Sequence, residues 1–301
     1  MKTRHACGIA VLLSVSCVNL ACAQSSWLST PESINAFREK VEAARPVPSN
    51  YQLEKIQDRT VALGDREIGI RIYDPGGDAP KPVLIYVHGA CLVAGSLNSH
   101  DEISRYLADK SGSMVIAIDY RLAPEFKYPA AHNDVYDVVQ WIWKNSNALG
   151  IDRNRFAIAG ESSGAYFAAA TVLRNLDETA DPVFSFLLLV FAVLEGDISS
   201  GSACKNHYFE KLEDSISRYG SPLRVDDLAG MPRTYSIYGE EENTRADQEE
   251  FMRKLGDSGV ATKSYMAKGV GHDVYTWLAA TEGVAAHEMA IKFIAAGFSA
   301  K

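Results

Sequence analysis

The sequence predicts an α/β fold in which helices cover both faces of a mostly parallel central sheet. Continuous apolar runs of strand length recur along the chain, and segments of helix length separate them. Strands that are apolar throughout are buried on both faces, as parallel strands are when crossover helices cover the sheet. The strand-like runs are residues 83–87, 114–118, 156–159, 184–191 and 235–238, and the helical segments are residues 99–110, 131–145, 163–175 and 244–255. Functional residues of such sheets gather where strands end and helices begin.

Composition and charge are those of a globular protein. Of the 301 residues, 47% are hydrophobic and 23% are charged, which excludes a disordered, collagen-like or coiled-coil chain. The formal net charge is −8, and it becomes more negative if the first residues, with Lys2 and Arg4, are removed. This charge argues against nucleic acid and anionic membranes as partners.

The first 23 residues have the pattern of a signal peptide. Lys2 and Arg4 precede an apolar run, residues 6–18, that falls short of the roughly 20 residues needed to span a bilayer. Ala21-Cys22-Ala23 then offers small residues for cleavage before Gln24. We therefore expect export to the periplasm or the medium, with no stable membrane insertion. Lipid attachment at Cys22 is the alternative.

The mature chain, residues 24–301, is expected to be a single domain without repeats or linkers. Its first helix is predicted over residues 30–40, where Thr30 is an N-cap type and Pro31 suits the first helical position. Residues 55–63 and 67–73 form a predicted hairpin around Gly64-Asp65. A small helical cap is expected from residues 24–50 and 192–225.

The pattern G-x-S-x-G stands at a predicted junction between strand and helix, in residues 160–164. Glycines suit the sharp turn there, which exposes the serine hydroxyl above the sheet. The start of the following helix also brings N–H groups to where negative charge would develop. Ser162 is therefore the predicted nucleophile.

A serine nucleophile needs a base and a carboxylate that orients the base. His272 lies on a glycine-rich loop, residues 268–273, and is preferred to His287, which lies in a helical pattern and is expected at the surface. Residues 240–242 are three glutamates after the strand 235–238. The order serine, acid, histidine is that of α/β-hydrolases, but spacing leaves open which glutamate serves.

The loop after strand 83–87 is the predicted oxyanion hole. It reads His88-Gly89-Ala90-Cys91, at the position where an HGGG-type loop would lie. Its backbone amides at Ala90 and Cys91, with the amide of Ser163, would stabilise a tetrahedral intermediate. Removal of one such donor costs about 10²–10³ in rate.

These motifs together resemble the bacterial hormone-sensitive-lipase-like family of α/β-hydrolase esterases. The most specific match is Asp119-Tyr120-Arg121-Leu122-Ala123-Pro124-Glu125, and the blocks around residues 86–101, 160–164 and 221–240 are also similar. The resemblance implies an α/β-hydrolase fold, a small-molecule carboxylic ester as substrate, and an acyl-serine intermediate without metal or cofactor.

The same resemblance assigns roles to individual residues. It places the acid on Glu242, where most members carry aspartate, and the base on His272. His88, Gly89 and Asp119 become loop-organising residues; the alternative for Asp119 is the role of a second catalytic acid.

The chain departs from the family pattern at three places. Ala90 and Cys91 replace glycines, and their side chains are expected to exclude backbone conformations that only glycine adopts readily. Ser163 replaces an alanine. Of the two cysteines after residue 23, Cys91 lies on this loop and Cys204 in the expected cap, so a disulfide between them would pin the cap to the site. The spacing does not decide whether they pair.

An exported serine carboxylesterase is the predicted function. The altered loop at Ala90 and Cys91 leaves open a hydrolase fold that binds a ligand without hydrolysing it, and the same residues would also support acyl transfer to an alcohol. The natural ester and the oligomeric state are not encoded in any pattern of the sequence.

Overall fold

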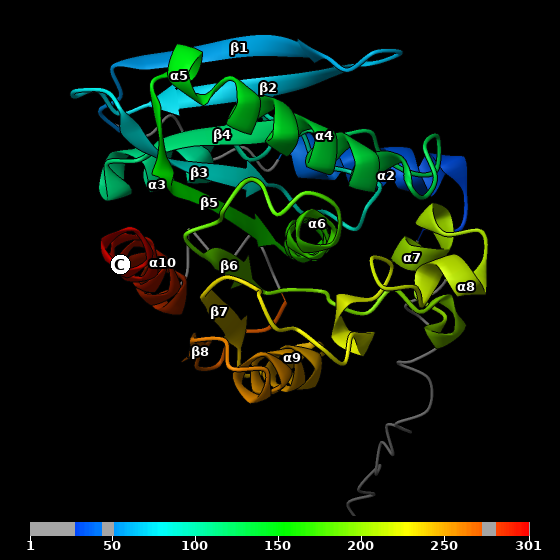
Figure 1. Cartoon of the computed structure of the whole chain (residues 1–301). Coiled ribbons are helices and arrows are strands. Elements are labelled where there is room, and N and C mark those ends of the chain that lie inside the picture. Colours follow the sequence, from blue (N-terminus) through cyan, green and yellow to red (C-terminus); the bar gives the residue numbers. More distant parts are fainter. Residues whose placement is uncertain (1–27, 44–50, 273–280, 301) are drawn as a thin grey trace, which may run out of the picture.

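The computed structural model describes residues 28–43, 51–272 and 281–300, and the predicted signal peptide lies outside these ranges. The described chain is built on one eight-stranded sheet with the order β1-β2-β4-β3-β5-β6-β7-β8 (Figure 1). The hairpin of β1 and β2 is antiparallel, β2 pairs antiparallel with β4, and every other pair is parallel. The strands are β1 Lys55–Ala62, β2 Glu67–Asp74, β3 Lys81–Val87, β4 Met114–Asp119, β5 Ile151–Glu161, β6 Leu187–Val190, β7 Thr234–Gly239 and β8 Thr262–Ala267.

Burial on both faces explains the continuous apolar run of residues 83–87 in β3. Val83 and Ile85 belong to one hydrophobic core, whereas Leu84 and Tyr86 belong to a second core on the other face. All four side chains are at most 3% exposed. Successive side chains of a strand point to opposite faces, so a strand segment covered on both faces favours apolar residues at every position.

Helices cover both faces of the sheet, as the sequence predicts. On one face α3 packs against β2 and β4, and α10 against α3 and strands β6 to β8. On the other face α6 packs against β3, β5, β6 and α4, and α9 against β7 and β8. Their bounds are α3 Asp101–Ser111, α4 Ala130–Lys144, α5 Ser146–Leu149, α6 Ser163–Glu178, α9 Arg245–Asp257 and α10 Thr281–Ser299. No helix of the described residues is long and apolar enough to cross a bilayer.

Short helices gather on the side to which the arrows of β3 and β5 point (Figure 1). They are α2 Pro31–Ala43, the 3-10 helices Ile198–Ser200 and Pro222–Arg224, α7 Ala203–Tyr208 and α8 Leu212–Ser215. These segments lie in the two stretches expected to form the cap. Only α2 has the length for a periodic apolar face, which is why the sequence alone did not resolve the helices between residues 198 and 224.

The register of β3 and β5 positions the site. Val83 pairs with Phe156 and Val87 with Gly160, so the two strands end side by side. The loop after β3 therefore lies against the turn after β5. These are the two segments expected to supply the oxyanion hole and the nucleophile.

Candidate active site

Ser162 occupies the sharp turn between β5 and α6. Its backbone has φ +49° and ψ −121°, a conformation that non-glycine residues rarely adopt. The turn brings α6 against β3 so closely that a Cβ on Gly164 would collide with the carbonyl of Val87. The Ser162 amide donates to the carbonyl of Val190 at 2.9 Å, which ties the turn to β6. The fold thus holds a strained serine at the end of the central strands, as the G-x-S-x-G pattern predicts.

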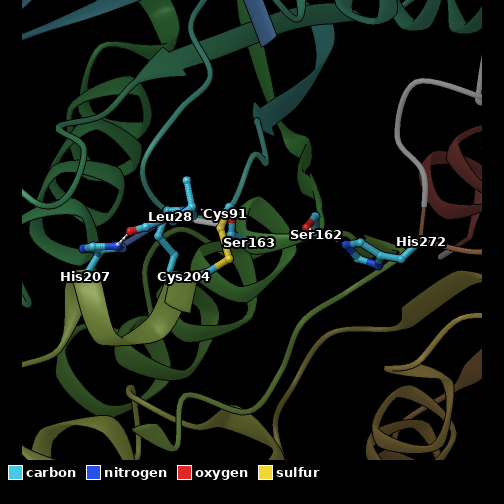
Figure 2. The surroundings of a disulfide bond; sticks show 8 residues. Leu28, Cys91, Ser162, Ser163, Cys204, His207 and His272 are labelled. Atoms are coloured by element: carbon cyan, nitrogen blue, oxygen red, sulfur yellow. Dashed lines mark hydrogen bonds between the residues drawn. A yellow bond between two sulfur atoms is a disulfide. The ribbon is translucent and has the colours of Figure 1, made fainter. Parts of the chain in front are cut away.

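The Ser162 hydroxyl is hydrogen-bonded to His272. Its Oγ lies 2.9 Å from Nε2 of His272 (Figure 2). Nδ1 of the same ring lies 2.6 Å from Oε1 of Glu242. This is the serine, histidine and carboxylate arrangement in which the ring accepts the hydroxyl proton and the carboxylate orients the ring. Residues far apart in the chain come together because each stands on a loop at the same edge of the sheet.

Glu242 is the glutamate that the structure places beside His272. It is 6% exposed, whereas Glu240 and Glu241 are exposed. Its Oε2 accepts the amide of Gly239 at 3.1 Å, and its Oε1 accepts the hydroxyl of Thr244 at 2.6 Å. These bonds fix the carboxylate in one orientation. Thr244 has no signature in the sequence and was not predicted.

The competing histidine lies elsewhere, and its expected exposure is wrong. His287 stands on α10, is 3% exposed, and has its ring 5.2 Å from that of Tyr106. Burial lowers its pKa to about 4, so the ring is neutral near pH 7. The helical pattern around residue 287 is amphipathic, and this histidine falls on the side that faces the sheet and α3.

The loop of residues 88–93 lies against the nucleophile. A Cβ on Gly89 would approach Cβ of Ser162 to 3.0 Å and the carbonyl oxygen of Glu161 to 2.8 Å, so only glycine fits there. Contrary to the expectation from side-chain sterics, the next three residues all have positive φ: Ala90 +85°, Cys91 +62° and Leu92 +65°. Within the described chain, the amides of residues 89–91 donate to no backbone or side-chain acceptor. They are free to bind a negatively charged oxygen.

His88, on the loop after β3, and Asp119, the last residue of β4, make no hydrogen bond to Ser162 or His272 in the described chain. The ring of His88 stacks on Tyr120 with centroids 4.4 Å apart, and the Tyr120 hydroxyl donates to the carbonyl of His88 at 2.7 Å. Burial lowers the pKa of His88 to about 3, so it is neutral. Asp119 receives a backbone hydrogen bond from Leu97, and burial raises its pKa.

A buried contact between a carboxylate and an imidazole adjoins Ser162. Glu161, which precedes Ser162, has Oε1 2.7 Å from Nε2 of His100, and both residues are at most 9% exposed. The His100 ring is 5.1 Å from that of His88, so it links the turn after β5 to the loop after β3. In the sequence Glu161 is only the variable position of G-x-S-x-G, and it was not predicted to matter.

Arg38 is a second residue that the sequence did not indicate. From α2 its Nε donates to the carbonyl of Val93 at 2.7 Å, and its guanidinium also reaches the carbonyl of Ala123 at 2.9 Å. Two further hydrogen bonds run from the guanidinium to the carboxylate of Glu125, at 2.9 Å from Nη1 to Oε1 and 2.6 Å from Nη2 to Oε2. One side chain thus joins the N-terminal helix to the two loops around the site.

Cys91 and Cys204 form a disulfide, which the sequence left undecided (Figure 2). Their Cα atoms are 5.1 Å apart and 113 residues separate them in the chain. The bond joins the 88–93 loop to α7, and α7 in turn contacts the start of the described chain, where Nε2 of His207 lies 2.6 Å from the carbonyl of Leu28. Among the described residues, no group of three or more His, Cys, Asp or Glu side chains is arranged to hold a metal ion.

Known proteins share this fold and sequence pattern. A family model for the alpha/beta hydrolase fold matches residues 84–276. An arylesterase of Saccharolobus solfataricus is 29% identical over 260 residues, covering 81% of this chain and 85% of that protein. An esterase of Acinetobacter venetianus is 31% identical over 252 residues, 77% of this chain and 80% of that protein. The solved structure of a hyperthermophilic esterase from Pyrobaculum calidifontis has a TM-score of 0.82 and 27% identity, covering 92% of this chain and 95% of that one.

Proposed function

The chain belongs to the α/β-hydrolase family and is a carboxylic ester hydrolase, and we propose that it works through an acyl-serine intermediate on Ser162. The observation that carries this proposal is the continuous chain of hydrogen bonds from Ser162 through His272 to Glu242. A protein that only binds a ligand has no use for this arrangement. The substrate is a small-molecule ester, as the names of the relatives suggest for those proteins.

In the first half of the reaction, Ser162 attacks the ester carbonyl. Nε2 of His272 takes the proton from Oγ of Ser162 as Oγ bonds to the carbonyl carbon. The oxygen that gains the negative charge is stabilised by the amides of Ala90, Cys91 and Ser163. His272 then gives its proton to the leaving alcohol as the carbon–oxygen bond breaks, which leaves the acyl group on Ser162.

In the second half, water replaces the alcohol. His272 takes a proton from a water molecule whose oxygen attacks the acyl carbon, and the same amides stabilise the second tetrahedral intermediate. The proton returns to Oγ of Ser162 as the acid leaves. Glu242 accepts a hydrogen bond from Nδ1–H of His272 without taking the proton, holds the ring in one tautomer, and stabilises the imidazolium.

The test is hydrolysis of p-nitrophenyl acetate, butyrate and octanoate by purified residues 24–301. We expect turnover by the wild type and a loss of about 10⁶-fold in kcat for Ser162→Ala, because no other group can carry the acyl chain. Ser199→Ala, which alters an exposed serine near α7, is the matched control and should retain the wild-type rate. A folded wild type without turnover would instead favour a ligand-binding protein.

We also propose that the chain is exported after cleavage before Gln24. The basic, apolar and small-residue order of the first 23 residues supports this, and so does the Cys91–Cys204 disulfide, because such bonds persist in oxidising compartments. Expression in a bacterium followed by fractionation and N-terminal sequencing should find the periplasmic or secreted chain starting at Gln24. Ala23→Asp should block the cleavage. A full-length chain confined to the cytoplasm would contradict the proposal.

A further inference from the structure

The 88–93 loop holds three successive non-glycine residues in a backbone region that favours glycine. Ala90, Cys91 and Leu92 have φ of +85°, +62° and +65°. In this region the Cβ atom of an L-residue crowds the neighbouring carbonyl oxygen, so each residue is populated less there than a glycine would be. The local preferences of these residues therefore work against the observed conformation of the loop.

Contacts from outside the loop oppose this local preference. The Leu92 amide donates to Oγ of Ser163 at 3.3 Å, and the Leu92 carbonyl accepts the amide of Ala123 at 3.0 Å. Cys91 is held differently, because its side chain is covalently bonded to Cys204. Of the two loop residues whose amides are proposed to bind the oxyanion, Ala90 and Cys91, only Cys91 is held by a disulfide.

The other end of the bridge is firmly anchored. Cys204 belongs to α7, whose last residue, Tyr208, is completely buried. The Tyr208 hydroxyl lies 2.7 Å from Nδ1 of His132, and its carbonyl accepts the amide of Tyr128 at 2.9 Å. The carbonyl of His207 accepts Nζ of Lys127 at 3.1 Å. A helix fastened in this way can hold a loop in a conformation that the loop would otherwise leave.

We propose that the Cys91–Cys204 disulfide positions the oxyanion hole. Covalent attachment to α7 keeps the backbone of Cys91 in the left-handed region. A glycine at this position would adopt the same backbone conformation without a cross-link, because it has no Cβ atom. The inference rests on the proposed esterase function and assigns to the bridge a role in kcat. Cys204 is a positioning residue that acts through Cys91.

The experiment compares two double variants that both lack the bridge, Cys91→Ala with Cys204→Ser and Cys91→Gly with Cys204→Ser. Hydrolysis of p-nitrophenyl butyrate gives kcat and KM, and non-reducing peptide mass spectrometry establishes the state of the bridge in the wild type. Thermal unfolding measures the stability of each variant. Both double variants lose the cross-link, so a difference in kcat between them reports on the conformation of residue 91 and not on the missing bond.

We expect the alanine variant to lose about 5- to 30-fold in kcat with KM nearly unchanged. This is the factor by which the left-handed conformation of a single non-glycine residue is less populated when nothing holds it there. The glycine variant should recover most of this loss although it is no more cross-linked. Equal kcat in the two double variants, at the wild-type or at a reduced level, would overturn the proposal. A change confined to KM would also overturn it, since the bridge would then serve substrate binding.

A second measurement covers the case in which a variant fails to fold. The folded wild type is treated with a phosphine reductant, and both thiols are titrated before the assay. A fall in kcat that reoxidation reverses is expected, and an unchanged kcat with both thiols free would overturn the proposal. The wild type and Ser162→Ala are assayed alongside, both oxidised. If only the wild type turns over, the esterase function stands whatever the bridge variants do.

Discussion

Glu242 shows how the surroundings of one residue settle a choice that spacing left open. Three glutamates follow β7, and any of them could in principle reach a histidine on a neighbouring loop. Only Glu242 turns inward, where the Gly239 amide and the Thr244 hydroxyl bind its two oxygens. A carboxylate held in this way has one fixed orientation toward the His272 ring, as the proposed mechanism requires.

Replacing Glu242 by glutamine tests this role. The amide is neutral and cannot stabilise the imidazolium, and its NH₂ group favours the wrong tautomer of His272. We expect kcat for p-nitrophenyl butyrate to fall by about 10⁴-fold with little change in KM. Steady-state kinetics of Glu241→Gln, an exposed neighbour, provides the matched control and should match the wild type. Comparable losses in both variants would show that Glu242 is not the acid.

At the scale of elements, the helices of residues 198–224 are held to the sheet by buried polar contacts as well as by apolar packing. His132 of α4 is central to this attachment. Its Nδ1 lies 2.7 Å from the hydroxyl of Tyr208 on α7, and its Nε2 lies 3.0 Å from the carbonyl of Tyr219. Burial is the main reason that the pKa of His132 falls to about 3. The ring is therefore neutral, with one nitrogen donating and the other accepting.

This attachment should weaken in acid. Unfolded histidine has a pKa near 6.5, so between about pH 6.5 and 3 the unfolded chain binds a proton that folded His132 does not. The free energy of unfolding then falls with decreasing pH by up to about 1.4 kcal/mol per unit from this residue alone. His132→Gln keeps a donor and an acceptor but does not titrate. Denaturant unfolding from pH 4 to 7 should give a shallower dependence for this variant by about that slope.

The comparison of wild type with His132→Gln needs two controls. The buried His88 and His287, with pKa values lowered to about 3 and 4, also destabilise the wild type in acid, so only the difference between the curves isolates His132. Above about pH 8 the difference between wild type and variant reports lost packing, because His132 is then neutral in both the folded and the unfolded state. Parallel curves across the whole range would contradict the assignment.

At the scale of the whole molecule, the central sheet and the chemistry at its edge could be predicted from the sequence. The apolar runs that become β3 to β7 are buried on both faces. Because burial on both faces favours apolar residues, these strands can be recognised in the sequence as continuous apolar segments. The same holds for the turn at Ser162, because glycine is required wherever backbones approach this closely. Strand β5 begins at Ile151, before the predicted start at residue 156. The prediction missed its first half because residues 152–155 are polar and interrupt the apolar run.

What the sequence could not decide depends on contacts between distant segments. His287 was expected at the surface because a helical pattern does not reveal which side faces the sheet. Arg38, Glu161 and Thr244 contact partners that no local pattern connects to them: Arg38 and Thr244 through hydrogen bonds, and Glu161 through its carboxylate against the ring of His100. The positive φ of Ala90 and Cys91 was unexpected for the same reason, since local sterics argue against it.

The sequence by itself determined the fold class and predicted Ser162 as the nucleophile and His272 as its base, because periodicity, glycine placement and loop composition act over a few residues. The resemblance of its motifs added the acid. Only the tertiary structure decided that Cys91 and Cys204 pair and that Glu242 is the buried glutamate. It also decided that α2 contacts the 88–93 loop through Arg38 and that α7 is bonded to the loop through Cys204. These depend on distances between residues up to 113 positions apart, which the packing of helices on the sheet fixes and the order of residues alone does not.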